Sequence, residues 1–495
     1  MKLLIRAVLV GSLIFPLQSL FGQYISTEQT FPVEGYSVFE EGYPLKVVPG
    51  KTGQFAFLEY WAAEKQGRRT ANHYLESYGT RNYVEHWFKP ITNEGFEGIR
   101  VDNLLRLEKA LVVIGRQYQE DSRLIQRVGR FFDVDGVPKG DEPVPISNYT
   151  RRPRKNFKDT TCVSLRGRAM LWLGYDDKSV YATAWNSNGK AIWEKDLEIP
   201  YWEEKYRLVE AQIDDEGNPF FLLKYAGTEL PDREPKPLML VKLDHEKDAY
   251  QTEVIPISSV GMLKHAHFQL LRDGGVVVTG VLVRNGGIGI RNGMKLGKEE
   301  EPEIWAEMFL KHYAPSETQK DSWEVIMDVF QPMPENWVRS YQQEGANFSL
   351  SRLIMAKDQA ILLFEEHYTT RKKLYFYDVG CLGVRLSTGE IAWSKIIKKR
   401  QRDTNSDAFM SYVAGVARDK LRVVYLTERG AAGQLMCTSV ELANGRRKDK
   451  MLASNEAAKY LFFPSRSGMV SNFEMVLIGR GNPSQNDFKL ITISF

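Results

Sequence analysis

The sequence contains little cysteine, and the few cysteines lie far apart. Cys162, Cys381 and Cys437 are the only cysteines among 495 residues. This spacing fits neither a disulfide framework nor a zinc site. One bridge in an oxidising compartment remains open, but an apolar core must provide most of the stability. Apolar residues make up 43% of the chain and aromatic residues 12%, which is enough for such a core.

Long apolar runs are also absent, except at the N-terminus. There, Lys2 and Arg6 precede an apolar stretch, residues 7–21, that is interrupted by Pro16 and polar residues. A bilayer-spanning helix needs about 20 apolar residues, so this stretch is typical of a cleaved signal peptide instead. We therefore expect a signal peptide at 1–22 and a mature protein, 23–495, that is periplasmic or secreted and has no transmembrane anchor.

An excess of charge of either sign is missing as well. The formal net charge is +3, and removal of Lys2 and Arg6 with the signal peptide lowers it to +1. Nucleic-acid binding needs a concentrated excess of Lys and Arg, so nucleic acid is not an expected partner. Local basic runs such as residues 398–400 are interpreted as solvated turns.

What the sequence does contain is a repeated pattern of short strands. Each of eight apolar, β-branched or aromatic runs follows a polar turn, as is typical of hairpins. These runs are residues 54–61, 111–118, 169–175, 219–225, 276–283, 360–367, 421–427 and 473–479. Segments before and after them, such as residues 206–213 and 238–243, have the same strand character, so each unit carries four strands.

Repeats of about 40–50 residues with four strands are typical of β-propeller blades. The sequence therefore predicts an all-β protein, a single β-propeller domain with eight blades, or alternatively seven. The last unit ends after three strands, and an open sheet edge would be exposed there. We expect a strand from the mature N-terminus, within residues 24–43, to complete this blade.

Two units share a turn followed by a tryptophan. Residues 187–193 and 387–393 align position by position, with Gly189 and Gly389 four residues before Trp193 and Trp393. These segments resemble the repeat of bacterial, exported propellers of the pyrroloquinoline-quinone type, in which such a Trp docks between neighbouring blades. The resemblance covers two of eight units and implies the fold. It does not extend to the quinone, because the sequence has neither an adjacent Cys pair nor a recognisable acidic calcium site.

Catalytic motifs are missing. Gly-x-Ser-x-Gly does not occur, and acidic doublets such as Glu365-Glu366 are interpreted as capping and solubility devices. No catalytic or ligand-binding residue can be named from the sequence, and whether the protein is an enzyme stays open, with a non-enzymatic role favoured.

The one paired histidine feature is His265-Ala266-His267, among seven histidines in the chain. Side chains two residues apart on a strand point to the same face, so both imidazoles could reach one divalent metal ion. A third ligand is not identifiable. Two hydrogen-bonded histidines at the wall of the central channel are the simpler interpretation, and no cofactor is otherwise expected.

The favoured function is an extracytoplasmic, non-enzymatic propeller of the cell envelope that binds an unknown protein or carbohydrate ligand. Propellers gather the loops between second and third strands, and those between blades, on one rim, and loops on rigid scaffolds commonly bind ligands. Here residues 226–237, 284–303 and 368–380 are the expected long connections. A carbohydrate-active or metal-dependent enzyme at this rim is one alternative. A structural spacer, which predicts a flat rim, is the other.

Overall fold

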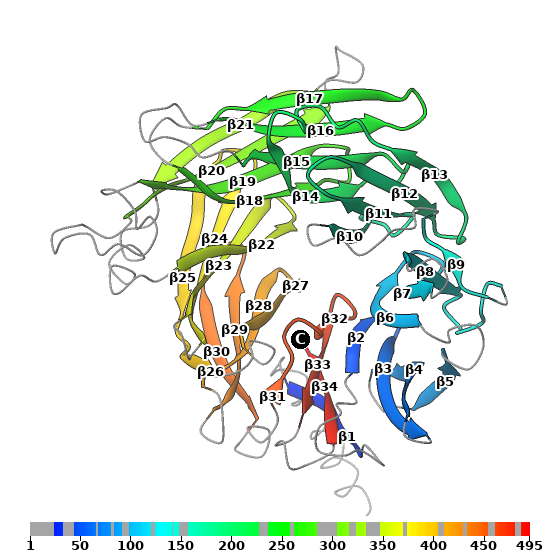
Figure 1. The fold of residues 1–495 in the computed structure, drawn as a ribbon. Coiled ribbons are helices and arrows are strands. Elements are labelled where there is room, and N and C mark those ends of the chain that lie inside the picture. The colour runs from blue at the N-terminus through cyan, green and yellow to red at the C-terminus, as the bar shows by residue number, and fades with distance from the viewer. Residues whose placement is uncertain are drawn as a thin grey trace, which may run out of the picture.

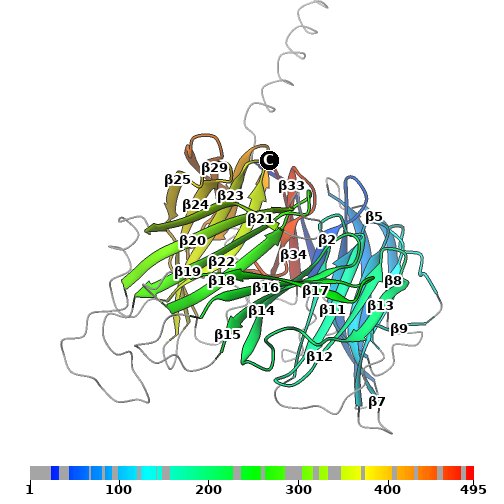
Figure 2. The ribbon, with the colours of Figure 1, turned by 90° about the horizontal axis from the view of Figure 1, so that it is seen from above.

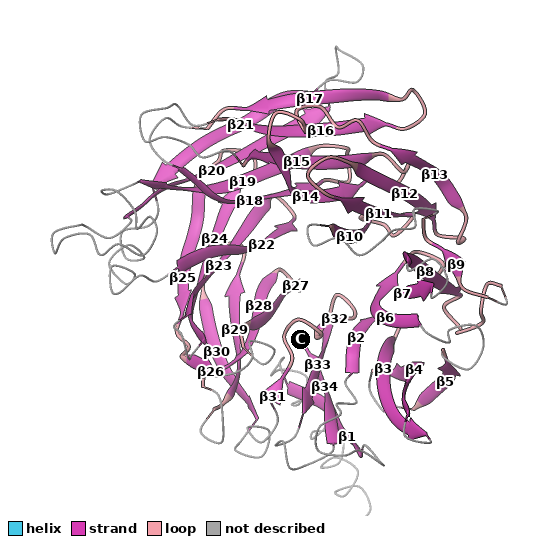
Figure 3. Cartoon of the chain, viewed as in Figure 1, coloured by secondary structure: helices cyan, strands magenta, loops and turns pink. Residues whose placement is uncertain are grey.

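The structure, a computed structural model, describes most of the chain after residue 23. The described residues are 24–32, 44–65, 68–80, 84–91, 99–119, 124–140, 142–147, 157–226, 236–257, 262–284, 304–315, 323–332, 347–369, 374–403, 410–428, 433–453, 461–480 and 487–495. All regular elements within these ranges are β-strands, and Figure 3 shows no helix among them. None of the described residues therefore belongs to a helix that would reach across a bilayer.

The strands form eight antiparallel sheets arranged as a ring, which confirms the eight-bladed propeller (Figure 1). Figure 2 views the ring from the side of blades 4 and 5. The first four blades are blade 1, β2 (Pro44–Pro49), β3 (Gln54–Lys65), β4 (Arg68–Gly79) and β5 (Glu85–Pro90); blade 2, β6 (Ile99–Arg106), β7 (Leu111–Gln119), β8 (Leu124–Phe132) and β9 (Val144–Pro145); blade 3, β10 (Lys158–Val163), β11 (Ala169–Tyr175), β12 (Val180–Asn186) and β13 (Ala191–Asp196); and blade 4, β14 (Tyr206–Ile213), β15 (Pro219–Tyr225), β16 (Leu238–Asp244) and β17 (Ala249–Ile255).

The second half of the chain repeats this order. Its blades are blade 5, β18 (Met262–Leu270), β19 (Val276–Arg284), β20 (Ile304–Pro315) and β21 (Trp323–Pro332); blade 6, β22 (Asn347–Ala356), β23 (Gln359–Thr369), β24 (Leu374–Arg385) and β25 (Ile391–Ile397), with β26 (Gln401–Asp403) on β24; blade 7, β27 (Tyr412–Ala417), β28 (Lys420–Leu426), β29 (Leu435–Glu441) and β30 (Arg447–Ala453); and blade 8, β31 (Leu461–Phe462), β32 (Gly468–Met469), β33 (Glu474–Arg480), β34 (Asp487–Ser494) and β1 (Tyr24–Pro32). The eight runs found in the sequence are the second strands of the eight blades.

Blade 8 is completed by the N-terminal strand, as the sequence predicts. β1 pairs antiparallel with β34, from Tyr24 opposite Ser494 to Pro32 opposite Asp487. Figure 1 shows this first strand beside the last one, so the two ends of the described chain share a sheet. The edge that β34 would otherwise expose is thereby covered.

The core lies between the blades rather than inside any one of them. A cluster of buried side chains joins blades 8 and 1, and similar clusters join blades 3 and 4 and blades 6 and 7. In the first of these, Val47, Phe55 and Tyr78 of blade 1 pack against Phe463 and Ile478 of blade 8, among others. Because burial of apolar area is the main source of stability, each blade depends on both of its neighbours.

Two tryptophans dock between blades through their indole nitrogens. Trp193 Nε1 donates to the carbonyl of Gly217 in blade 4 at 2.9 Å, and Trp393 Nε1 donates to that of Leu442 in blade 7 at 3.0 Å. Both side chains are largely buried, at 9% and 5% exposure. Gly445, in the turn between β29 and β30, lies so close to Trp393 that a Cβ atom there would be 2.4 Å from the Trp393 Cβ.

One expected connection differs from the sequence prediction. β23 continues to Thr369 and β24 begins at Leu374, so most of residues 368–380 is strand rather than loop. The run of Leu, Tyr and Phe from Leu374 to Tyr377 has high strand propensity, which explains the extension. Of the other two expected connections, 226–237 and 284–303, the parts 227–235 and 285–303 lie outside the described residues.

Gly445→Ala should lower the free energy of unfolding more than Gly53→Ala does. Both glycines have a positive φ, +68° and +75°, which costs an alanine about 1–2 kcal/mol. Nothing lies within 4 Å of a Cβ at Gly53, whereas one at Gly445 meets Trp393. The clash adds about 1–3 kcal/mol of overpacking. Urea unfolding of both variants measures the difference, and equal losses would contradict the close docking of Trp393.

Candidate functional site

The innermost strands of five blades contain a β-bulge at nearly the same place. The register shifts by one residue within β2, β6, β14, β18 and β22. Bulges re-aim the side chains beside them and are frequent next to functional sites. In all five strands the residue that follows the bulge is polar: Lys46, Asn103, Glu210, His265 and Arg352.

Several of these side chains connect one blade to the next. Lys46 Nζ donates to Asn103 Oδ1 at 2.8 Å, and Asn103 Nδ2 donates to Thr161 Oγ1 at 3.3 Å, which links blades 1, 2 and 3. Burial lowers the pKa of Lys46. The bulges thus place polar groups where the inner strands of neighbouring blades meet.

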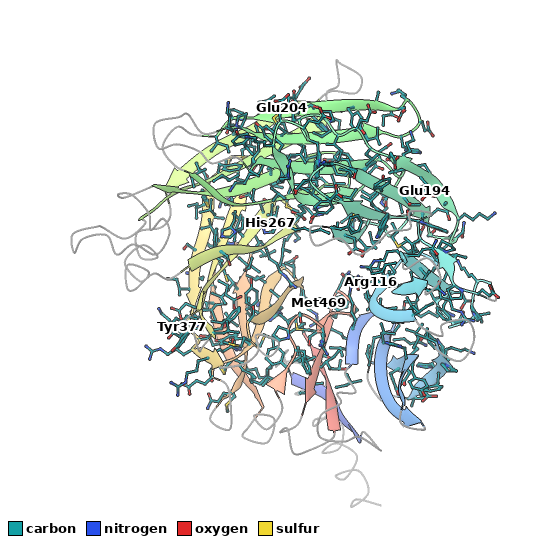
Figure 4. The ribbon with its side chains drawn as sticks, in the orientation of Figure 1. Arg116, Glu194, Glu204, His267, Tyr377 and Met469 are labelled. Atoms are coloured by element: carbon teal, nitrogen blue, oxygen red, sulfur yellow. The ribbon has the colours of Figure 1, made fainter. Side chains whose placement is uncertain are left out.

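His267 continues this pattern across blades 4, 5 and 6. Its Nδ1 lies 3.2 Å from Glu210 Oε2 of blade 4, and its Nε2 lies 3.1 Å from the Leu350 carbonyl of blade 6. In Figure 4, His267 lies near the axis of the ring, as Arg116 and Met469 do. The other labelled residues, Glu194, Glu204 and Tyr377, lie toward the outside of the ring. Both ring nitrogens of His267 therefore lie against protein acceptors.

The metal hypothesis for His265 and His267 stays a prediction. Ala266 between them is buried while both histidines are partly exposed, which agrees with two side chains on one face of the strand. Among the residues that the structure describes, no group of three or more His, Cys, Asp or Glu side chains is placed to hold a metal ion. All three cysteines are free, and burial raises the pKa of each to about 12.

A pocket lies where blades 6, 7 and 8 meet, and we call it the rim pocket. Its volume is about 300 Å³, and its lining residues are Ser351, Arg352, Phe376, Met410, Ser411, Tyr412, Pro464 and Ser465. Met410 and Ser411 belong to the connection between blades 6 and 7, so the pocket lies beside the rim that carries the connections from blade to blade. The three blades contribute separate parts of its wall.

Behind the rim pocket lies a buried ion pair. Lys399 Nζ lies 2.7 Å from Glu365 Oε1, and the exposed fractions of the two side chains are 0% and 6%. Lys399 Nζ also donates to Gln401 Oε1 at 3.1 Å, and Gln401 Nε2 donates to the Leu426 carbonyl at 2.9 Å. A buried charge pair is tolerated only when further hydrogen bonds satisfy its atoms, and this network supplies them.

The same network fixes Ser411 in the pocket wall. The Ser411 hydroxyl donates to Glu365 Oε2 at 2.6 Å, and its backbone N–H donates to Gln401 Oε1 at 2.7 Å. Ser411 has a φ of 86°, an unfavourable value for a residue other than glycine. Strained backbone of this kind persists only where its surroundings hold it, and it is concentrated at functional sites.

Tyr412 and Ser351, which both line the rim pocket, are joined to each other. The Tyr412 hydroxyl makes a short hydrogen bond with Ser351 Oγ, which also contacts the Leu363 carbonyl at 3.0 Å. Burial, and after it the charge of Glu365, raises the pKa of Tyr412. The phenol therefore stays neutral at physiological pH.

Two sequence interpretations are wrong at this site. Residues 398–400 are not simply a solvated turn, because Lys399 is buried while Lys398 and Arg400 are exposed. On extended backbone, successive side chains point to opposite faces, so the middle residue of a charged run can face the interior. Glu365 is likewise not a solubility device but the partner of Lys399.

A second cavity, of about 410 Å³, lies on the opposite rim between the turns of blades 3, 4 and 5. Several of its charged groups already have partners in the protein. Arg166 pairs with Asp215 at 3.6 Å, and Asp214 accepts hydrogen bonds from the backbone of Glu216 and Asn218 in its own turn. We therefore regard the rim pocket as the better candidate site.

Comparison with known proteins supplies neither a family nor a function for this chain. No protein-family model matches the sequence, and no curated protein is similar to it. Among solved structures, the Dos1 propeller is 8% identical, with 94% of each chain covered and a TM-score of 0.46. The WD40 domain of SCAP from fission yeast is 8% identical, with 94% of each chain covered and a TM-score of 0.41. The polysaccharide lyase Uly1 is 9% identical, with 95% of this chain and 99% of that chain covered and a TM-score of 0.42.

Lys399→Met should lower the free energy of unfolding by about 3–5 kcal/mol, because it leaves the Glu365 carboxylate buried without a cation. The double variant Lys399→Met/Glu365→Gln should recover much of this loss. Lys357→Met is the matched control: its pair with Asp419 is exposed, at 67% and 66%, and should change stability by less than about 1 kcal/mol. Urea unfolding of the three variants and of wild type measures these values. Similar losses in Lys399→Met and Lys357→Met would disprove the buried pair.

His267→Gln should destabilise the protein more in acid than in base. Burial alone would lower the pKa of His267. The hydrogen bond to Glu210 and the charge of Glu210 raise this pKa by more than burial lowers it, so the pKa of His267 lies above its usual value. A pKa raised by folding stabilises the protein below the unfolded value, about 6.5, and this stabilisation is lost as the pH rises through the folded value. The free energies of unfolding of wild type and of His267→Gln are measured at about pH 5.5, where the imidazole is protonated, and at about pH 8.5, where it is neutral. A pH-independent difference from wild type would show that Glu210 does not stabilise the imidazolium.

Proposed function

We propose that the protein is a non-enzymatic binding module of the cell envelope that presents the rim pocket to a ligand or to another envelope protein. The observation that carries this proposal is the rim pocket itself, with a wall held by the buried Lys399–Glu365 pair. Its volume of about 300 Å³ falls at the lower end of the range typical of ligand sites. The export part of the proposal depends on the signal peptide predicted from residues 1–22.

The chemistry of the rim pocket suits binding. A site that is ordered before the ligand arrives does not lose affinity to ordering of its own side chains. Glu365, the carboxylate behind the pocket, has one oxygen on Lys399 and the other on Ser411, so both are engaged in holding the wall. A pocketed rim also supports a binding role over a purely structural spacer, which would have a flat one.

A ligand array against the mature protein, residues 23–495, tests this function. Ser465→Trp places a bulky side chain at the mouth of the rim pocket, and Asn472→Trp, also exposed in blade 8 but outside the pocket lining, is the control. We expect at least one ligand that wild type and Asn472→Trp bind and Ser465→Trp does not. An array in which every ligand binds both variants alike, or activity screening that finds turnover abolished by Ser465→Trp, would contradict a non-enzymatic binding role.

A further inference from the structure

We propose that the rim pocket recognises the carboxylate of a small amphipathic ligand, with Arg352 as the group that binds the carboxylate. This inference rests on the proposed function and adds the chemical class of the ligand. A carboxylate next to an apolar group, the chemistry proposed for this ligand, occurs both in free organic acids and at the C-terminus of a peptide.

Arg352 lies in the pocket lining in a fixed position. It follows the bulge at Ser351, and its Nη1 donates to the Ala414 carbonyl of blade 7 at 3.0 Å. A guanidinium has five N–H donors in a rigid plane, so one bond to a carbonyl orients the group and leaves donors for a ligand. Arg352 is exposed, and none of the ion pairs among the described residues includes it.

The charge around the pocket favours a monoanion. The charges of Lys399 and Glu365 cancel within their buried pair, and Tyr412 is neutral. Arg352 is therefore the cation that the lining offers, and one guanidinium matches one planar carboxylate through two parallel hydrogen bonds. Ser351, Ser411 and Ser465 add polar residues to the same lining.

The remaining wall is apolar. Phe376, Met410 and Pro464 complete the lining, and the Lys399 ammonium lies 5.7 Å from the centre of the Phe376 ring. An aromatic or aliphatic group attached to the carboxylate would pack on these three side chains. The ligand therefore has a charged end at Arg352 and an apolar end between blades 6 and 8.

The experiment uses matched acids and amides. Calorimetric titration of the mature protein compares 4-phenylbutyrate with 4-phenylbutyramide, and the peptide Gly-Gly-Phe with its C-terminal amide. In at least one pair, we expect the acid to bind about tenfold or more tightly than the amide, as a charge-assisted hydrogen bond requires. The acid pair and the peptide pair distinguish a free organic acid from a peptide C-terminus as the source of the carboxylate.

Variants of Arg352 identify the binding group. Arg352→Gln should weaken binding of the acid about tenfold or more, and Arg352→Lys, which keeps the charge but not the planar fork, should weaken it less. Arg400→Gln removes an exposed charge from blade 6 outside the pocket lining and should leave the affinity within about twofold. The comparison of acid with amide needs no variant, so it decides the proposal even if Arg352→Gln does not fold.

Two results would overturn the inference. Equal binding of acid and amide, or unchanged affinity in both Arg352 variants, would show that the carboxylate is not recognised by Arg352. If Ser465→Trp still abolishes binding of some neutral ligand, the proposed function survives and only the ligand class is wrong. If no ligand of any class responds to Ser465→Trp, the proposed function fails as well.

Discussion

The whole ring depends on one pairing, that of the first described strand with the last. β34 has β33 on one side, and its other edge is covered only because β1 pairs with it over the length of the strand. The closure also brings blade 8 against blade 1, where Phe463 and Ile478 pack with Val47 and Phe55. An open ring would expose both a sheet edge and two apolar faces. Closure is therefore the condition under which all eight blades bury their faces.

A closed ring fixes the inner strands beside one another, and the polar features of the protein follow from that arrangement. Several of the bulges in the inner strands direct polar side chains toward the next blade, as Lys46 does toward Asn103 and Glu210 toward His267. The rim pocket is built in the same way, with Arg352 from blade 6, Tyr412 from blade 7 and Ser465 from blade 8. A site assembled from separate blades leaves no local motif in the sequence.

The sequence predicted those parts of the fold that local patterns determine. The eight second strands were found because each is an apolar run after a turn, and the closure was predicted because the last unit lacked a strand. The docking of Trp193 and Trp393 followed from two aligned segments. These features depend on residues that are close together in the chain, or on a count of strands.

The buried pair could not be predicted in this way, because Glu365 lies on β23 and Lys399 in the connection between β25 and β26, and each stands in a charged sequence. Within the short connection that contains them, Lys399 is buried, whereas its neighbours Lys398 and Arg400 are exposed. The bulges did leave a signal. Adjacent polar residues, such as Ser351-Arg352 and Asp102-Asn103, break the alternation of apolar and polar residues within the strand, and an extra residue in the ladder explains the break.

Closure is tested most directly by removal of β1. Thermal unfolding and size-exclusion chromatography would compare a protein that begins at residue 23 with one that begins at residue 33. We predict that the shorter protein melts at a lower temperature and associates as its concentration rises, because the edge of β34 and the last blade are left uncovered. A shorter protein that stays monomeric and melts at the same temperature would contradict a ring closed by its N-terminal strand.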